Sequence, residues 1–134
     1  MLDKKLKLSL LLLRIGVFIV MGIWTIDKFI RPAHTSAVFK KFYLISDLSV
    51  NMSYIVGSIQ LFVVFAFLLG FKKRISYGLV LILHTISTLS SFQQYLNPWE
   101  GGNILFFAAW PMLSAIIMLY LLRDQDTLFT LNKG

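Results

Sequence analysis

The sequence predicts an all-α integral membrane protein: a four-helix bundle with a short amphipathic surface helix between the first and second membrane spans. Three observations lead to this fold class. Of the 134 residues, 57% are hydrophobic and only 14% are charged, and the mean hydropathy is +0.77. Four apolar stretches are long enough to cross a bilayer, which takes about 20 helical residues. No alternation of apolar and polar residues predicts a strand.

The four spans are expected to form a single membrane domain of residues 1–134, since this length suits one domain. We place the spans at about 8–30, 53–71, 76–95 and 103–122. Turn-forming or charged residues separate them. Arg31-Pro32 ends the first span, the triplet KKR (72–74) separates the second from the third, and NPWEGGN (97–103) separates the third from the fourth.

Basic residues predict the orientation, because loops rich in Lys and Arg stay in the cytoplasm. If both termini are cytoplasmic, nine basic residues lie on the inner side: Lys4, Lys5, Lys7, Arg14, Lys72, Lys73, Arg74, Arg123 and Lys133. Four lie on the outer side: Lys28, Arg31, Lys40 and Lys41. We therefore expect a multi-pass membrane protein with both termini in the cytoplasm.

The segment 35–46 interleaves aromatic and basic residues, as in FKKFY (39–43). This pattern predicts an amphipathic helix that lies on the outer membrane surface. An ordinary polar loop is the alternative.

The charge and cysteine counts exclude several classes of function. The net charge is +7, but short separated groups carry it, so we expect contacts with lipid headgroups and no nucleic-acid binding. The chain has no cysteine, which excludes disulfides, thiolate metal sites and a disulfide-exchange enzyme made of this chain alone. His84 and His34 have no partners at ligand spacing, so no metal site is expected.

Polar side chains inside the bilayer are costly and usually face the interior of a bundle. Arg14 lies two turns into the first span, and we expect it to extend to the inner headgroups. Gln60 lies in the second span, about 10 Å below its outer end at 1.5 Å per residue. It either bonds to a neighbouring helix or belongs to a ligand site.

The third span carries a polar stripe that begins near mid-membrane. At helical spacing one face collects His84, Ser87, Thr88, Ser91 and Gln94 or Tyr95. Such a stripe either holds helices together or lines a polar cavity. The titratable imidazole and the glutamines favour the cavity.

Tryptophans divide into two groups by expected depth. Trp24 and Trp99 fall where an outer aromatic belt would lie. Trp110 lies deeper, so it either packs inside the bundle or stacks on a flat ligand. Pro111 removes a hydrogen-bond donor from the fourth span and predicts a kink there.

Charges gather at the end of the first span in the turn formed by Asp27, Lys28 and Arg31. Asp27 and Arg31 are four residues apart and can pair on one face of a helix, with Lys28 pointing elsewhere. We expect a partly buried pair that abuts the polar stripe of the third span. A simple topological anchor is the alternative.

The stretch LLLRIGVFIVMGIWTIDKFIRPAHTSAVFKKF (11–42) resembles the first span and surface helix of the DoxX-like family. The residues that carry the resemblance are Arg14, Gly16, Gly22, Trp24, Asp27, Lys28 and Pro32. IVGSIQLFVVFAFLLGFKKRISYGLVL (55–81) resembles the family's second span, with Gln60 where many relatives have Glu. Glu100 resembles the acidic residue before the family's last span. The loose motifs together cover nearly the whole chain.

This resemblance implies a small four-helix inner-membrane protein, in a family where some members are subunits of quinone-linked oxidoreductases and others are chaperones or cargo receptors. One hypothesis is a redox-associated subunit that binds a quinone or similar amphiphile near the outer leaflet, with electrons from a partner protein. His84 or Gln94 would hydrogen-bond a carbonyl of the ligand, Trp110 would stack on it, and Asp27 with Glu100 would relay protons. The full set of ligand-binding candidates is Trp24, Asp27, Gln60, His84, Ser87, Ser91, Gln94, Glu100 and Trp110.

The other hypothesis is non-catalytic: an assembly factor, a lipid or small-molecule binder, or a transporter subunit. Four short helices are a small scaffold for transport unless the protein forms a homo-oligomer. The sequence contains no self-contained catalytic motif, so whether the protein is an enzyme stays open, and catalytic residues are not assigned.

Overall fold

The computed structural model describes residues 1–46 and 49–131, and every regular element within these residues is a helix. The α-helices are α1 (Leu2–Ile30), α2 (Pro32–Tyr43), α3 (Val50–Leu68), α4 (Lys73–Ser90), α5 (Phe92–Leu96) and α6 (Ala109–Leu121). Two 3-10 segments, η1 (Asn103–Ala108) and η2 (Arg123–Gln125), flank α6. The all-α class predicted from the sequence is confirmed.

The predicted count of four spanning helices plus one surface helix is not matched. The described residues contain six α-helices, because the predicted span 76–95 breaks at Ser91 into α4 and α5. Three helical stretches of the described chain are long and apolar enough to cross a membrane: Leu2–Ile30, Val50–Leu68 and Asn103–Leu121.

α4 is not among these three stretches, because polar residues lower its mean hydropathy. Most of these polar residues lie on one face of the helix. Several of its polar side chains turn inward: Lys73, Ser76, His84 and Thr88 are buried. Its outer face is apolar and exposes Ile75, Leu79, Ile82, Leu83, Ile86 and Leu89. A hydropathy average over the whole helix therefore understates how apolar its outward surface is.

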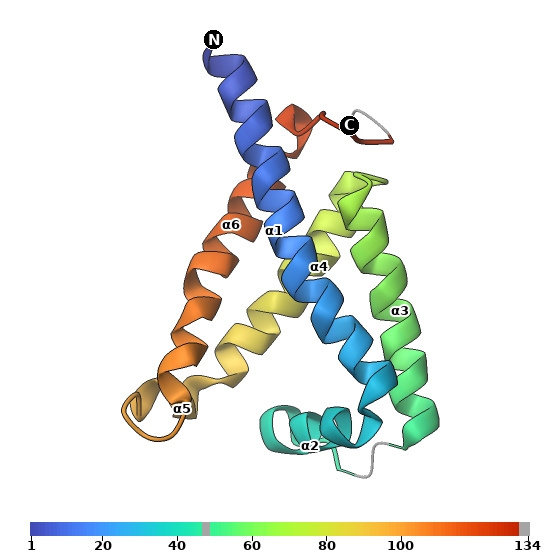
Figure 1. Cartoon of the computed structure of the whole chain (residues 1–134), viewed down its shortest axis with the longest axis vertical. Coiled ribbons are helices and arrows are strands. Elements are labelled where there is room, and N and C mark those ends of the chain that lie inside the picture. Colours follow the sequence, from blue (N-terminus) through green and yellow to red (C-terminus); the bar gives the residue numbers. More distant parts are fainter. Residues whose placement is uncertain (47–48, 132–134) are drawn as a thin grey trace.

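The predicted surface helix exists as α2. Proline is tolerated at the first helical position, where its missing N–H has no partner to lose, and Pro32 occupies this position in α2. Arg31 separates α1 from α2 and its backbone N–H donates to the Asp27 carbonyl at 2.8 Å. In Figure 1, α2 lies across one end of the bundle.

The sequence predicted that Pro111 would kink a continuous fourth span, and the structure shows no such kink. It lies in the first turn of α6, after the 3-10 segment η1. A backbone N–H in the first turn has no helical acceptor, so proline costs little there. In place of the expected kink, the chain changes from the 3-10 segment η1 to the α-helix α6 just before Pro111.

The long helices cross one another rather than running parallel (Figure 1). α1 packs chiefly on α3, and α4 packs chiefly on α6. The start of α1 and the last described residues of the chain lie at one end of the bundle, which we call the terminal end; it also holds the turn between α3 and α4 (Figure 1). We call the opposite end, which holds α2 and α5, the loop end.

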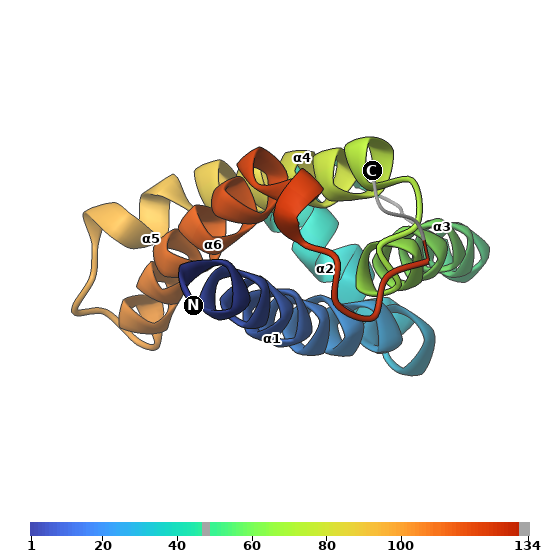
Figure 2. The same cartoon turned by 90° about the horizontal axis from the view of Figure 1, so that it is seen from above.

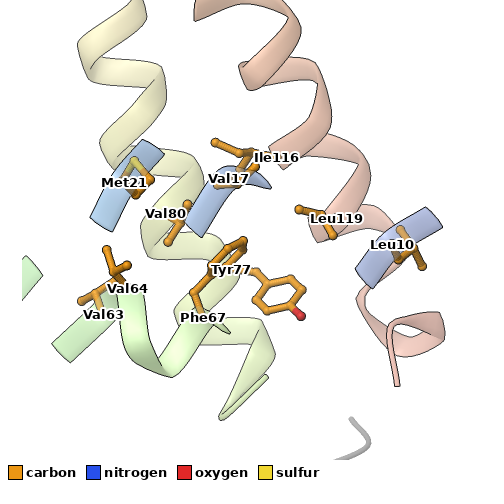
Figure 3. Packing of buried hydrophobic residues seen from close by; sticks show 10 residues of the cluster. All are labelled: Leu10, Val17, Met21, Val63, Val64, Phe67, Tyr77, Val80, Ile116 and Leu119. Atoms are coloured by element: carbon orange, nitrogen blue, oxygen red, sulfur yellow. The ribbon is translucent and has the colours of Figure 1, made fainter. Parts of the chain in front are cut away.

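The apolar core lies between α1, α3, α4 and α6 (Figure 3). Its buried members are Leu10, Val17, Met21, Val63, Val64, Phe67, Tyr77, Val80, Ile116 and Leu119. The rings of Phe67 and Tyr77 lie 4.9 Å apart between α3 and α4. This contact fixes the two helices where they meet near the terminal end.

Burial of polar groups sets this protein apart from a water-soluble bundle. Arg14, Lys73 and His84 are each at most 1% exposed, while large apolar side chains such as Ile19 and Phe62 are more than half exposed. Charged groups are rarely buried in soluble domains, and large exposed apolar surfaces mark contact with lipid or protein. The fold therefore combines an apolar exterior with polar groups on the inside.

Candidate functional site

The described chain ends in a strap, residues 123–131, which folds back over the terminal end of the bundle (Figure 2). The Leu131 backbone N–H donates to the Leu69 carbonyl at 2.8 Å. Gly70, at φ +63°, makes room for the strap, because a Cβ at this position would lie 2.5 Å from the Thr130 side chain. The strap is thus fitted closely to the turn after α3.

A buried group of charged residues anchors the strap, and we call Arg14, Lys73, Tyr77 and Asp126 the Arg14 cluster. Arg14 Nη1 lies 2.6 Å from Asp126 Oδ1, and the Tyr77 hydroxyl donates to Asp126 Oδ2 at 2.6 Å. Lys73 Nζ donates to the carbonyls of Arg123 and Asp126. All four residues are at most 1% exposed.

The charges of the Arg14 cluster are compensated in two different ways. Arg14 has a carboxylate partner in Asp126, and it also donates to the Leu128 carbonyl. Lys73 instead binds carbonyl oxygens that follow α6, where the helix dipole is negative. Breaking a buried ion pair by removing one partner costs about 3–5 kcal/mol. The cluster therefore holds α1, α4 and the strap together.

The expected extension of Arg14 to the inner headgroups is wrong, because Arg14 is 1% exposed and paired with Asp126. Sequence reasoning did not find Asp126, Lys73 or Tyr77. One signal was available: an arginine in an apolar span requires a partner, and the chain has only six acidic residues. The separation of 112 residues between Arg14 and Asp126 hid the pair from arguments based on spacing.

A second polar group lies nearer the loop end, around His84 on α4. The His84 ring is 1% exposed and stacks on Trp24 of α1, with ring centroids 6.1 Å apart and planes at 20°. His84 Nε2 lies 3.0 Å from the Ala109 carbonyl oxygen at the start of α6. One imidazole thus links α1, α4 and α6.

The Ala109 contact sets the tautomer of His84. A carbonyl oxygen only accepts, so Nε2 carries the proton, and in the neutral ring Nδ1 is then an acceptor. This Nδ1 is buried and has no hydrogen-bond partner among the described residues. A buried polar atom without a partner costs free energy. His84 therefore offers an acceptor to a group that can donate a hydrogen bond, and not the donor to a ligand carbonyl that we expected from the sequence.

Aromatic side chains extend the site from His84 toward the surface. Thr88 Oγ1 donates to the His84 carbonyl at 2.7 Å, and the Tyr95 hydroxyl donates to the Thr88 carbonyl at 2.8 Å. The Tyr95 ring lies 5.5 Å from the Trp110 ring. Trp24 and Trp110 are each 42% exposed. We call Trp24, His84, Thr88, Tyr95 and Trp110 the His84 cluster.

The other candidates on the polar stripe occupy different environments. Ser91 and Gln94 are buried, as His84 is, whereas Ser87 is half-buried. Gln94 Oε1 is a second buried acceptor without a partner in the described chain. The stripe predicted from helical spacing is thus found on the inner face of α4 and α5.

Gln60 and Glu100 are not gathered with His84. Gln60 is half-buried on α3, and no hydrogen bond or ring contact joins it to the His84 cluster within the described residues. Glu100 is exposed in the turn after α5. Among the described residues no hydrogen bond joins it to Asp27, its expected partner in a proton relay; the side chain of Asp27 binds Arg31 and His34 instead.

The charged turn at the end of α1 forms the pair expected from the sequence. Arg31 Nε lies 2.6 Å from Asp27 Oδ1, and His34 Nδ1 lies 2.6 Å from Asp27 Oδ2. Lys28 points elsewhere, with Nζ 3.5 Å from the Trp24 carbonyl. The side chains of Arg31 and His34 are 63% and 45% exposed. The pair is therefore mainly a surface pair, contrary to the expected partial burial.

Comparison with known proteins gave no relative: no family model, no curated protein and no solved structure matches this chain. The resemblance to the DoxX-like family stays a prediction from the residues quoted above. The geometry of the two polar clusters is therefore the basis for inferring a function.

Proposed function

We propose that this protein is a multi-pass protein of the bacterial cytoplasmic membrane that binds a quinone, in its quinol form, or a similar amphiphile beside His84, as a subunit associated with a redox enzyme. The observation that carries the proposal is the buried Nδ1 of His84 without a partner. An amphiphile with a hydroxyl on a flat ring would supply both the missing donor and a surface for stacking.

The membrane assignment is supported by the three long apolar helices and by the apolar outward face of α4. The start of α1 and the last described residues lie at the terminal end (Figure 1), and a chain with an even number of spans has this arrangement. We propose that α4 also spans the membrane, as the third span along the chain, and that the terminal end faces the cytoplasm, since Lys and Arg are more numerous there.

Access to His84 would pass Trp24. Its ring covers one face of the imidazole and is 42% exposed, so a rotation of this side chain uncovers His84 without a change in the backbone. Trp110 and Tyr95 offer further aromatic surface on the α6 side. Gln94 Oε1, a second acceptor without a partner, fits a ligand with more than one donor.

Any electron transfer would need a partner protein, because the chain has no cysteine and the His84 cluster holds no paired axial ligands for haem. In this proposal the chain holds and orients the amphiphile, and the partner carries out the redox step.

A non-catalytic role is the second candidate: an assembly factor, or a lipid or small-molecule binder. The observation that favours it is the nearly complete burial of His84, at 1% exposed, with Nε2 already bonded to Ala109. In this case His84 has a structural role, in which it holds α1, α4 and α6 together. Any ligand of the protein would then bind away from His84.

Organic extraction of the protein, purified in mild detergent from a quinone-containing bacterium, tests the proposal. Mass spectrometry should find quinone at a near-stoichiometric ratio in the wild type and little in His84→Leu or Gln94→Leu. His34→Leu is the matched control, since His34 is exposed at the loop end, and it should retain quinone. Phospholipid alone in the wild type would contradict the proposal and favour the second candidate.

A further inference from the structure

The buried side chains divide the interior of the bundle into an apolar part and a polar part. Toward the loop end, the last buried apolar side chains of α1, α3, α4 and α6 are Met21, Val63, Val80 and Ile116. Beyond them, every buried side chain among the described residues is polar. We call this set the polar half: Thr25, Thr35, Ser53, His84, Thr88, Ser91 and Gln94.

Hydrogen bonds to backbone carbonyls account for some members of the polar half. The hydroxyls of Thr25, Thr88 and Ser91 each donate to the carbonyl four residues earlier in the chain, at 2.7, 2.7 and 3.2 Å. The Ser53 hydroxyl donates to the Lys28 carbonyl at 2.9 Å. Hydroxyls that bond in this way are satisfied as donors and can lie in a dry interface between helices. These residues alone would indicate packing.

Three other atoms of the polar half are buried without a partner. His84 Nδ1, Gln94 Oε1 and Thr35 Oγ1 have no hydrogen-bond partner in the part of the chain that the structure describes. An unpaired polar atom in apolar surroundings costs free energy, and ordered water usually pairs with such atoms in folded proteins. The three atoms belong to α4, α5 and α2. The need for a partner is therefore spread over the polar half and is not confined to His84.

The surface helix α2 covers the polar half at the loop end. It packs on α1, α3 and α4, and it lies between α1 and α4 in Figure 2. Thr35 is the one buried residue of α2, so no buried apolar side chain of this helix seals the loop end. On the other side, Met21 and Val80 belong to the apolar core, which separates the polar half from the terminal end. The polar half is thus sealed toward the terminal end only.

We propose that the polar half holds water that is continuous with the aqueous phase at the loop end and reaches His84 Nδ1. His84 Nδ1 and Gln94 Oε1 only accept hydrogen bonds, and water can donate to both. Polar residues inside a membrane bundle often line such water-filled paths. The proposal rests on the membrane assignment of the proposed function and does not require a quinone. Protons exchanged at His84 would then pass to or from one side of the membrane only.

Single cysteines test this path, since the chain has none of its own. Thr88→Cys and Thr25→Cys place a thiol in the polar half. Val80→Cys and Val17→Cys are the matched controls, because each lies eight residues earlier on the same helix, in the apolar core. The probe is Ag⁺, a small hydrophilic ion that binds the thiolate, and apolar surroundings suppress this form of the thiol. In lipid vesicles the polar-half variants should react about tenfold faster than their controls.

Membrane vesicles of the two orientations test where the water enters. Ala33→Cys, at an exposed position of α2, identifies the side of the loop end in each preparation. Thr88→Cys should react faster when Ag⁺ is added on that side, and unreacted thiols are counted with a maleimide in denaturant. The unfolding temperature in detergent shows that each variant is folded.

Equal rates within both matched pairs would overturn the proposal, because the polar half would then be as dry as the core. Faster reaction of Thr88→Cys from the side of the terminal end would also overturn it. These rates do not depend on a ligand at His84. Absence of quinone from the purified protein would therefore contradict the proposed function and leave the water path standing.

Discussion

Two ion pairs of the same length lie at opposite ends of the bundle in opposite surroundings. Arg14 and Asp126 are 2.6 Å apart with side chains 1% and 0% exposed, whereas Arg31 and Asp27 are 2.6 Å apart with side chains 63% and 20% exposed. Water and salt screen the second pair but not the first. Burial, rather than distance, decides what each pair contributes.

The comparison assigns different roles to the two ends of the molecule. At the terminal end, the buried pair holds a distant segment, the strap, against α1 and α4. At the loop end, the exposed pair joins neighbours in sequence and leaves the adjacent residues accessible. The terminal end is thus held by a buried ion pair between distant segments, whereas the ion pair at the loop end is exposed and joins neighbours in sequence.

The largest expected effect is that of Asp126→Asn. This change leaves the guanidinium of Arg14 buried without a counter-charge, and we expect a loss of about 3–5 kcal/mol in the free energy of unfolding in detergent. Thermal unfolding of the purified variant measures it. Asp124→Asn, two residues earlier in the same segment, is the control and should behave like the wild type. Equal stability of the two variants would contradict the buried lock.

Tyr77→Phe should have the next largest effect. It removes the hydroxyl that donates to Asp126 Oδ2 and keeps the ring against Phe67. A hydrogen bond to a charged group contributes about 1.5–3 kcal/mol. Tyr54→Phe, an aromatic hydroxyl removed on the exposed surface of α3, is the control. A similar unfolding temperature for both variants would show that the bond to Asp126 contributes little.

Gly70→Ala compared with Gly101→Ala should measure the fit of the strap. Both glycines have positive φ, at +63° and +52°, so both substitutions strain the backbone. Only the Cβ at residue 70 meets a neighbour, at 2.5 Å from Thr130, whereas nothing lies within 4 Å at residue 101. Overpacking costs about 1–3 kcal/mol, so Gly70→Ala should be less stable than Gly101→Ala by that amount. Equal losses would mean that the strap does not press on Gly70.

The smallest effect is expected from Asp27→Asn. An exposed ion pair contributes about 0–1 kcal/mol, and the interaction with Arg31 is screened further by salt. Unfolding temperatures at low and high salt should differ slightly for the wild type and not for the variant. A loss comparable to that of Asp126→Asn would show that the turn is buried in the membrane-bound protein.

Local features of the structure were predictable from the sequence. Composition and the lengths of the apolar stretches predicted helices and their approximate places. Spacing of four residues predicted the pair of Asp27 and Arg31, and helical periodicity predicted the buried stripe around His84. In each case the relevant partners lie within a few turns of one helix, where spacing determines proximity.

Features that depend on distant parts of the chain were not predictable in this way. The strap, its carboxylate Asp126 and the burial of Arg14 follow from a contact across 112 residues. The break of the third span at Ser91 was also missed. Serine and threonine side chains compete for backbone groups and weaken helices, and here Ser91 follows a run rich in such residues, so a continuous span was a poor assumption.

Double-mutant cycles on the two ion pairs test the central claim most directly. Arg14→Met, Asp126→Leu and their combination form one cycle, and Arg31→Gln, Asp27→Asn and their combination form the other, all measured as free energies of unfolding in the same detergent. We expect the combined variant of the first pair to recover much of the loss of either single variant, with a coupling of several kcal/mol. The second pair should couple by less than about 1 kcal/mol. Equal coupling in the two cycles would contradict the account of a strong buried pair at the terminal end and a weak exposed pair at the loop end.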